Sequence, residues 1–354
     1  MGFTKRFRKI ICTFLLVLSG LFVFCIPSFA CTAFSVKTGD DVYFGKNWDF
    51  DPARQNEVRI VLEELPDGRS CLYFLLGGFV CSAITSDGFY STCNENQGAN
   101  GPLVEYDENI MVDIGHLREN LMNFSTIDGL KEYIGSRKVV CMGYPEHVLF
   151  ADRTGKACLV ETDNSEDYLI DDSDGVLVAT NFFVKNMESP DKPGDSGCWR
   201  YEAAYNTILE NRADFNADTA ALVLKNSIQS GFTIYSFVYS IKENSVYLYL
   251  KRDFEKVWKF SFDTQELTTF KGFDEQKSFV LDSEGVMLSR IMLYQSVGID
   301  IESKTESKEA HVYSGTDYKK TIFNEEYFWG IIVAALISGA VITCVVVAKS
   351  KKKK

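Results

Sequence analysis

Histidine is scarce in this chain of 354 residues, which contains only three: His116, His147 and His311. His116 falls in an expected helix, His147 begins an expected strand, and His311 lies in a polar stretch, so each is interpreted as structural. The sequence has no cysteine and histidine spacing typical of a zinc site, and we expect neither a metal nor an organic cofactor. A nucleophilic site in this chain would therefore need a base other than histidine.

Positive charge is also in deficit. The 37 Lys and Arg residues are outnumbered by 49 Asp and Glu residues, giving a net charge of −12 at pH 7. Many of the basic residues are concentrated at the two ends, so the part between is more acidic still. Nucleic acid is therefore not an expected partner. The sequence has no internal repeat, and residues 31–300 are expected to form one domain around one large core.

The first thirty residues have the pattern of a signal peptide. Basic residues between positions 5 and 9 precede an apolar run from Ile10 to Phe24, and small residues lead to Ala30. This order is typical of a cleavable leader, so residues 1–30 are predicted to be removed; an uncleaved membrane anchor is the alternative. Cleavage after Ala30 would make Cys31 the first residue of the mature protein.

The other end predicts a membrane anchor. Residues 301–328 are polar, as in a stalk, and residues 329–348 form an uncharged run long enough for a helix to cross a hydrocarbon core of about 30 Å. Residues 349–354 are lysine-rich, and the positive-inside rule places them in the cytoplasm. The expected protein is single-pass in the cell membrane, with its 31–300 domain extracytoplasmic.

The cysteines give an odd number. Of ten, Cys12 and Cys25 lie in the leader and Cys344 in the expected membrane span. The seven others are Cys31, Cys71, Cys81, Cys93, Cys141, Cys158 and Cys198. In an oxidising compartment six of these could pair as disulfides, leaving one thiol, and Cys31 would be a consistent choice for it. The alternative is that several remain buried and unpaired.

Hydrophobic periodicity predicts an α+β protein. Alternating runs indicate hairpin strands, and two helices are expected at 108–124 and from about Thr126, with two more at 200–210 and 217–227. The expected strands are 32–37, 41–45, 58–62, 71–75, 80–84, 147–152, 156–161, 175–180, 233–240, 245–250 and 257–262. Strands and helices in separate blocks indicate antiparallel sheets covered by helix layers.

A cysteine at a chain terminus combines two catalytic groups. Its thiol is a nucleophile, and its α-amine, with a reference pKa of about 7.7 to 8.0, can act as the base. Such a site also needs an acid to hold the amine and donors for an oxyanion. A hairpin of strands 32–37 and 41–45 would bring Lys46 and Asp49 back toward Cys31.

These residues resemble a known family. Cys31 to Phe34 (CTAF) and Gly45 to Phe50 (GKNWDF) are similar to the opening of the choloylglycine hydrolase and penicillin V acylase family of N-terminal nucleophile hydrolases, which is related to a C45 peptidase and acyltransferase group. Thr85 to Asn94 (TSDGFYSTCN), Val178 to Asn181 (VATN) and Trp199 to Ala204 (WRYEAA) resemble later family segments in the same order. The likeness covers about residues 31–265, and it implies a four-layer αββα sandwich.

The resemblance assigns catalytic roles. Cys31 would be the nucleophile, and Asp49 would hold its amine. Asn94, with Asn96 as a fallback, and Asn181 would support the oxyanion or orient the amine, while Arg200 would stabilise the cluster electrostatically.

Lys46, Asn47 and Trp48 are the expected substrate-binding residues. Lys46 departs from the family, which usually has arginine there; lysine keeps the positive charge but loses the planar, two-pronged donor.

The sequence therefore predicts an exported, membrane-tethered cysteine amidohydrolase. It would cleave a linear, non-peptide or N-acyl C–N amide bond in a small molecule through a thioester acyl-enzyme. The aromatic residues Trp48, Phe50, Phe182 and Phe183 beside the expected site favour an apolar or aromatic acyl group; the alternative is that they belong to the core. Two alternatives stay open: an acyltransferase using the same site, or a non-catalytic surface protein that binds acyl amides, including a lipoprotein with an acylated Cys31.

Overall fold

A computed structural model of the chain describes residues 31–300, apart from 40, 96–106, 108, 142–145, 163–166, 173 and 190–197. The predicted signal peptide, stalk, transmembrane helix and cytoplasmic tail all lie outside the described residues. Among the helices of the described ranges, none is long and apolar enough to cross a membrane.

Two large antiparallel sheets form the centre of the molecule. The first has the strand order β12-β1-β2-β13-β14-β15-β16-β17, and the second has the order β11-β10-β9-β6-β5-β4-β3-β18. The strands of the first sheet are β1 (Thr32–Lys37), β2 (Val42–Asp49), β12 (Val176–Ala179), β13 (Thr233–Ser240), β14 (Ser245–Leu250), β15 (Asp253–Ser261), β16 (Glu266–Lys271) and β17 (Ser278–Val280). Those of the second are β3 (Val58–Glu64), β4 (Ser70–Leu76), β5 (Phe79–Thr85), β6 (Tyr90–Glu95), β9 (Glu146–Ala151), β10 (Ala157–Thr162), β11 (Asp167–Asp171) and β18 (Val286–Met287).

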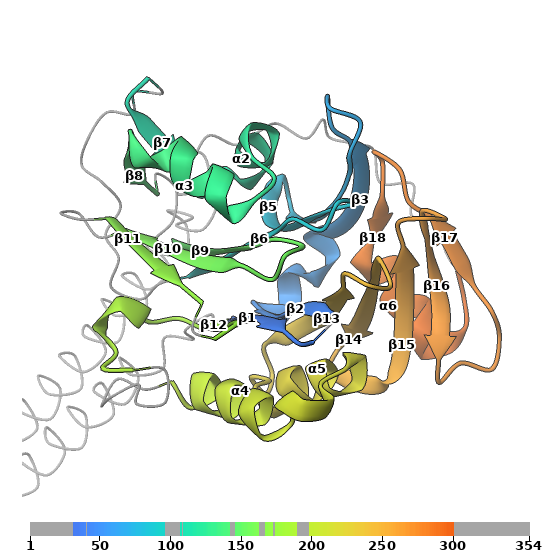
Figure 1. Cartoon of the computed structure of the whole chain (residues 1–354). Helices are drawn as coiled ribbons and strands as arrows, with labels where there is room; N and C mark the ends of the chain where they lie inside the picture. Colours follow the sequence, from blue (N-terminus) through green and yellow to red (C-terminus); the bar gives the residue numbers. More distant parts are fainter. Residues whose placement is uncertain are drawn as a thin grey trace, which may run out of the picture.

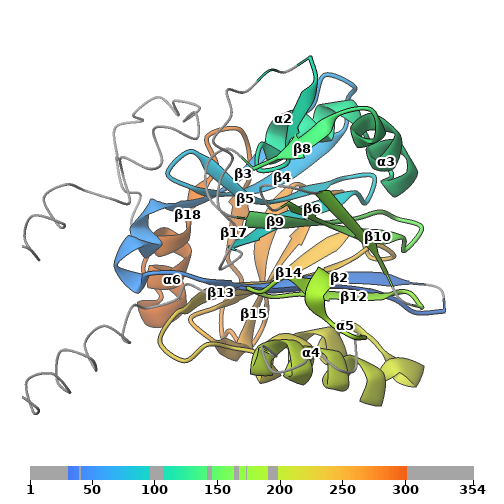
Figure 2. The ribbon, with the colours of Figure 1, turned by 90° about the vertical axis from the view of Figure 1, so that its left-hand side faces the viewer.

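Helices cover the outer face of each sheet, so the layers follow the predicted order of helix, sheet, sheet and helix (Figures 1 and 2). Helices α4 (Trp199–Glu210) and α5 (Ala217–Asn226) pack on the first sheet. Helices α2 (Leu117–Asn123) and α3 (Ile127–Gly135) pack on the second. The remaining elements are η1 (Pro52–Glu57), η2 (Val184–Asn186), η3 (Arg212–Asp214), α6 (Leu288–Val297) and the small parallel pair β7 (Met111–Asp113) and β8 (Lys138–Val140).

The largest core lies between the two sheets and is rich in aromatic rings. Phe44 of β2 stacks on Tyr90 of β6 with ring centroids 5.2 Å apart, and Phe74 of β4 stacks on Phe237 of β13 at 4.7 Å. Most strands near the middle of each sheet have buried side chains on both faces, because there each sheet is covered on both sides. Burial of this aromatic surface is the main force that holds the sheets together.

The helix predicted at 108–124 is wrong in its first half. Residues 111–113 form β7, which pairs in parallel with β8. The Asp113 Oδ1 atom then accepts a hydrogen bond from the Gly115 amide at 3.0 Å, a local turn that competes with helical hydrogen bonding. The helix begins only at Leu117. By contrast, the second predicted helix starts as expected, with Thr126 accepting from the Gly129 amide at 3.0 Å.

The expectation of disulfide bonds is also wrong for the part of the chain that the structure describes, where the seven cysteines form none. They are spread over different strands and cores: Cys71 and Cys158 pack under the helix layer of the second sheet, whereas Cys81 belongs to the inter-sheet core. Cys81 and Cys93 lie on neighbouring strands, yet the Cys93 thiol is directed at the Cys81 carbonyl oxygen, 3.4 Å away. The second alternative, buried thiols without disulfides, describes them better.

Candidate active site

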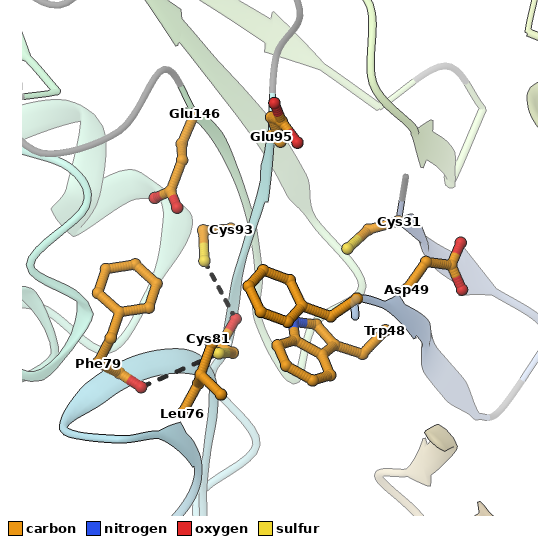
Figure 3. A pocket seen from close by; sticks show the side chains of 10 residues that line it. Cys31, Trp48, Asp49, Leu76, Phe79, Cys81, Cys93, Glu95 and Glu146 are labelled. Carbon is orange, nitrogen blue, oxygen red and sulfur yellow. Dashed lines mark hydrogen bonds between the residues drawn. The ribbon is translucent and has the colours of Figure 1, made fainter. Parts of the chain in front are cut away.

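A cavity opens beside Cys31, between the ends of the two sheets (Figure 3). Its lining combines thiols, carboxyl groups and apolar side chains: Cys31, Trp48, Asp49, Phe50, Leu76, Phe79, Cys81, Cys93, Glu95 and Glu146. Trp48 and Phe50 stack with ring centroids 5.0 Å apart and form an apolar wall. Three of the residues predicted for the site, Cys31, Asp49 and Trp48, therefore line one cavity.

The β1–β2 hairpin positions Cys31. The register pairs Thr32 with Asn47, which sets Cys31 beside the end of β2. Gly45 is needed in this hairpin because a Cβ atom there would come within 2.3 Å of the Phe34 ring. Burial raises the pKa of the Cys31 thiol, while the positive charge of Lys46 and a hydrogen bond from the Asp49 amide oppose that rise.

Asp49 is the last residue of β2 and lies beside Cys31. Its Oδ1 atom accepts a hydrogen bond from Thr233 Oγ1 at 2.5 Å. Its buried Oδ2 atom has no hydrogen-bond partner among the described residues and lies 3.7 Å from Arg200 Nη1. Burial raises the pKa of Asp49 to about 7, against the opposing effects of Thr233 and Arg200. This carboxyl group therefore changes charge near neutral pH.

Arg200, on the first turn of α4, ties the site together. Its Nη1 atom donates to the Cys31 carbonyl oxygen at 2.8 Å, and both terminal nitrogens lie 3.2 Å from Asn181 Oδ1. The guanidinium is almost fully buried. Because its planar group contacts both Cys31, just before β1, and Asn181, two residues after the end of β12, it fixes these two chain segments relative to each other.

Lys46 connects the two sheets. Its ammonium group donates to Thr92 Oγ1 at 2.6 Å and to the Cys93 carbonyl oxygen, both on β6 of the opposite sheet. The side chain is fully buried and does not line the cavity. The structure thus places this predicted substrate-binding residue next to the cavity wall, with hydrogen bonds to the protein itself.

Asn47 points away from the cavity. Strand alternation turns its side chain to the opposite face from Lys46 and Trp48. There its Nδ2 atom donates to the Leu224 carbonyl oxygen of α5 at 2.9 Å, and its Oδ1 atom accepts from Ser236 Oγ at 2.6 Å. These contacts attach the helix layer to the first sheet.

The two predicted asparagines face the space between the sheets. Asn94 Nδ2 donates to the Ala179 carbonyl oxygen at a long 3.4 Å, and its buried Oδ1 atom has no partner in the described part of the chain. Asn181 accepts from Arg200 and donates to the Glu95 carbonyl oxygen at 2.6 Å. Neither side chain lines the cavity. The fallback residue, Asn96, lies outside the described residues.

Sequence reasoning missed Glu95, Glu146, Cys81 and Cys93 as cavity residues. Burial raises the pKa of Glu146 to about 8, although the charge of Lys46 opposes the rise. Cys93 and Glu95 flank Asn94, so the segment that resembles the family could have indicated them. Glu146 begins β9, far away in sequence, and no local pattern marks it.

The described histidines do not line the cavity. His147 is fully buried, with Nδ1 2.8 Å from Glu161 Oε1 and Nε2 2.6 Å from the Thr180 carbonyl oxygen. Glu161 also accepts from the Val184 amide at 2.8 Å. This buried pair holds the chain just before Asn181 against β9 and β10. The described residues also contain no cluster of three His, Cys, Asp or Glu residues that could hold a metal ion.

The arrangement suits acyl chemistry on a thiol. A nucleophilic sulfur, a carboxyl group that titrates near neutral pH and a fixed guanidinium lie together at the end of one hairpin. Asparagine amides from β6 and from the residue after Thr180 approach from the same inter-sheet region. Such a cluster can activate a thiol and stabilise charge on a tetrahedral intermediate.

Comparison with known proteins finds the fold in solved structures. No family model matches the chain, and no curated protein matches its sequence. A mutant of conjugated bile acid hydrolase from Clostridium perfringens superposes with a TM-score of 0.52 over 72% of this chain and 97% of its own, at 14% identity. A second variant of the same hydrolase gives 0.52, over 72% and 98%, at 13% identity. The chain shares the fold of this hydrolase, as the resemblance in the sequence implied.

Proposed function

We propose that this protein is an N-terminal cysteine amidohydrolase that cleaves a linear, non-peptide C–N amide bond. The observation that carries the proposal is the pairing of Cys31 with Asp49 in one cavity. The buried Oδ2 atom of Asp49 has no hydrogen-bond partner in the described part of the chain. An α-amine on Cys31 would supply the donor that this oxygen lacks. The fold shared with a conjugated bile acid hydrolase, whose name describes hydrolysis of an acyl conjugate, supports the same reaction class.

The mechanism follows from the site. The sulfur of Cys31 attacks the carbonyl carbon of the amide, and the α-amine of the same residue takes the thiol proton. Asp49 holds the resulting ammonium. Asn94 is the proposed oxyanion donor, a role for which its Nδ2 group turns from the Ala179 carbonyl oxygen, 3.4 Å away, toward the cavity. The C–N bond breaks as the ammonium returns its proton to the leaving amine. Water then attacks the thioester, giving the carboxylic acid and the free thiol.

Arg200 and Asn181 are positioning residues that hold Cys31 in place. Arg200 holds the Cys31 carbonyl oxygen, and Asn181 connects that guanidinium to the Glu95 carbonyl oxygen on β6. The nucleophile, on the first sheet, is thereby fixed relative to Asn94, on the second. We assign them to the orientation of the terminus, with Arg200 also favouring negative charge nearby.

Export and membrane tethering belong to the proposal through the sequence patterns of residues 1–30 and 329–348. The reaction needs the removal of residues 1–30 that accompanies export, because the α-amine of Cys31 is a base only when no residue precedes it. Protease treatment of intact cells tests the topology: loss of the 31–300 domain with retention of a membrane-bound C-terminal fragment is expected. Protection of the whole domain would contradict it.

The first test of function is the N-terminus itself. Intact mass and N-terminal sequencing of the mature protein should show Cys31 as residue one, with a free amine and with its thiol modified by an alkylating reagent. The wild type is then assayed against a set of N-acyl amides beside Cys31→Ala, Cys31→Ser and the control Cys198→Ala, whose thiol lies outside the cavity.

A variant with one glycine inserted before Cys31 makes the test specific. It keeps the thiol but converts the α-amine into an amide, so hydrolysis should fall by at least about a hundredfold. Full activity of this variant would refute the self-based mechanism. A mature terminus upstream of Cys31, or a lipid-modified one, would instead favour a non-catalytic binding protein.

A further inference from the structure

The cavity beside Cys31 is acidic where an amide substrate would extend. Asp49, Glu95 and Glu146 contribute three carboxyl groups to its lining, and the described lining contains neither lysine nor arginine. A carboxylate on a substrate would meet no cation among the described residues that line the cavity.

The two nearby cations are already engaged. Lys46 lies behind the cavity wall and donates to Thr92 and to the Cys93 carbonyl oxygen. Arg200 donates to the Cys31 carbonyl oxygen and to Asn181. Both positive charges reduce the negative potential near the cavity. Neither side chain lines the cavity, so neither can bind a substrate anion there.

Among the lining residues, Glu146 is the best placed to distinguish a positively charged substrate from a negatively charged one. Only 6% of it is exposed, it lines the cavity, and its carboxyl group points toward Cys93 and Phe79 in Figure 3. Its neighbour in that direction is a thiol, which is a weak donor and leaves the carboxyl group poorly stabilised as an anion. A buried carboxyl group of this kind gains a strong partner only from a cation.

The opposite part of the lining is apolar. Trp48, Phe50, Leu76 and Phe79 provide aromatic and aliphatic surface. This division matches the two halves of an amide substrate. A hydrophobic acyl chain would pack against the aromatic wall, and a charged group on the leaving amine would lie near the carboxyl groups.

We propose, as a deepening of the proposed hydrolase function on which it rests, that the substrate is an N-acylated diamine, whose leaving amine carries a positive charge beyond the scissile bond. Glu146, whose raised pKa keeps it largely protonated at neutral pH, loses its proton to solvent when that charge binds beside it, and the carboxylate so formed selects the cation. Glu95 is a further carboxyl group on the same lining. Amides whose leaving group is an amino acid, with a free carboxylate, are disfavoured. Hydrolysis then releases a fatty or aromatic acid and a diamine.

The charge preference can be measured without any hydrolysis. Two methanethiosulfonate reagents of similar size, one with an ethylammonium and one with an ethylsulfonate group, are reacted with the full-length mature protein, and the rate at Cys31 is read by peptide mass. The reaction is run at about pH 9, above the pKa of about 8 of Glu146, so that this carboxyl group is ionised. The ratio of cation to anion rates should then exceed that of a small cysteine peptide at the same pH by about tenfold. Glu146→Gln should lower the ratio several-fold, whereas Glu210→Gln, at the exposed end of α4, should not change it.

The substrate class is tested with three amides of one acyl chain, in which the leaving group is ethylenediamine, ethanolamine or glycine. At about pH 9, where Glu146 is ionised, the expected order of kcat/KM is cation, neutral, anion, with Glu146→Gln reducing the cation rate and raising the anion rate. Equal or faster cleavage of the glycine amide, or a reagent ratio no higher than that of the peptide, would overturn the inference. If the ratio is raised but no amide is cleaved, the charge selection stands and the proposed hydrolysis fails.

Discussion

Lys46 on the first sheet donates a hydrogen bond to Thr92 on the second, with 2.6 Å between Nζ and Oγ1. The same ammonium reaches the Cys93 carbonyl oxygen. The buried charge therefore has two tasks: it joins β2 to β6, and it lowers the pKa of the Cys31 thiol against the effect of burial. A lysine with these partners differs from a surface charge, since its removal takes a charged donor away from two buried oxygen atoms.

Substitution Lys46→Met should therefore affect both stability and reactivity. Loss of the buried hydrogen bonds should lower the free energy of unfolding by about 1 to 3 kcal/mol, measured by denaturant titration. The pKa of Cys31 should rise, so the pH at which alkylation becomes fast moves upward. Lys37→Met, at the exposed end of β1, is the control and should change neither quantity. An unaltered alkylation profile in the Lys46 variant would argue against electrostatic activation.

The pH dependence of hydrolysis should follow the ionisation of the Asp49 carboxyl group. Its pKa of about 7 means that the carboxylate is lost as pH falls below neutrality, so kcat/KM should rise with pH through about 7. Asp49→Asn should reduce kcat by about a hundredfold and remove this inflection, leaving only the titration of the α-amine. Retention of the inflection near 7 in the variant would mean that another group controls the rate.

Glu146 should make the fold less stable as pH rises. Its pKa is raised to about 8 in the folded state, above the ordinary value of 4.5, so the folded protein binds more protons than the unfolded chain between these values. Stability from this group is present below pH 4.5 and is lost progressively as pH approaches 8. Glu146→Gln should therefore be more stable than the wild type at alkaline pH, by at least about 1 kcal/mol. Thermal unfolding across this range, with Glu210→Gln as the control, measures the difference. A constant gap between variant and wild type would contradict the shift.

Asn94 and Asn47 form a matched pair for separating catalysis from stability. Asn94→Ala should lower kcat by about 10²- to 10³-fold with little change in KM, because an oxyanion donor acts mainly in the transition state. Asn47→Ala removes the contacts to Leu224 and Ser236 and should cost about 1 to 3 kcal/mol of stability while the folded enzyme keeps its kcat. Steady-state kinetics and denaturant unfolding on both variants decide the assignment. A loss of stability in Asn94→Ala together with a loss of kcat in Asn47→Ala would contradict both assignments.

Much of the fold follows from local patterns. The strands at 233–240 and 245–250 have the predicted bounds because alternation and the intervening turn are both local signals. The expected end of the second strand at Gly45 was too early, and this error has a consequence for the site. Since β2 continues to Asp49, a period of two places Asn47 on the helix side, whereas an irregular segment would leave its direction open.

Other features depend on contacts between distant segments. Nothing near Glu146 in the sequence indicates that it lines the same cavity as Cys31, because β9 and β1 belong to different sheets. The strand at Met111 forms through pairing with residue 138, and this partner competes successfully with the helical periodicity around it. The absence of disulfides among the described cysteines likewise depends on where each strand lies in its sheet.

The site is assembled from both sheets, with Cys31 and Asp49 on one and Asn94 and Glu146 on the other. Lys46 and the stacked aromatic rings set the spacing between the two layers. Catalytic activity should therefore depend on the distance between the two sheets. A substitution that leaves a cavity in that core, or that overpacks it, would misalign the nucleophile and the oxyanion donor while each sheet remains intact. Activity would then fade on heating before the secondary structure melts.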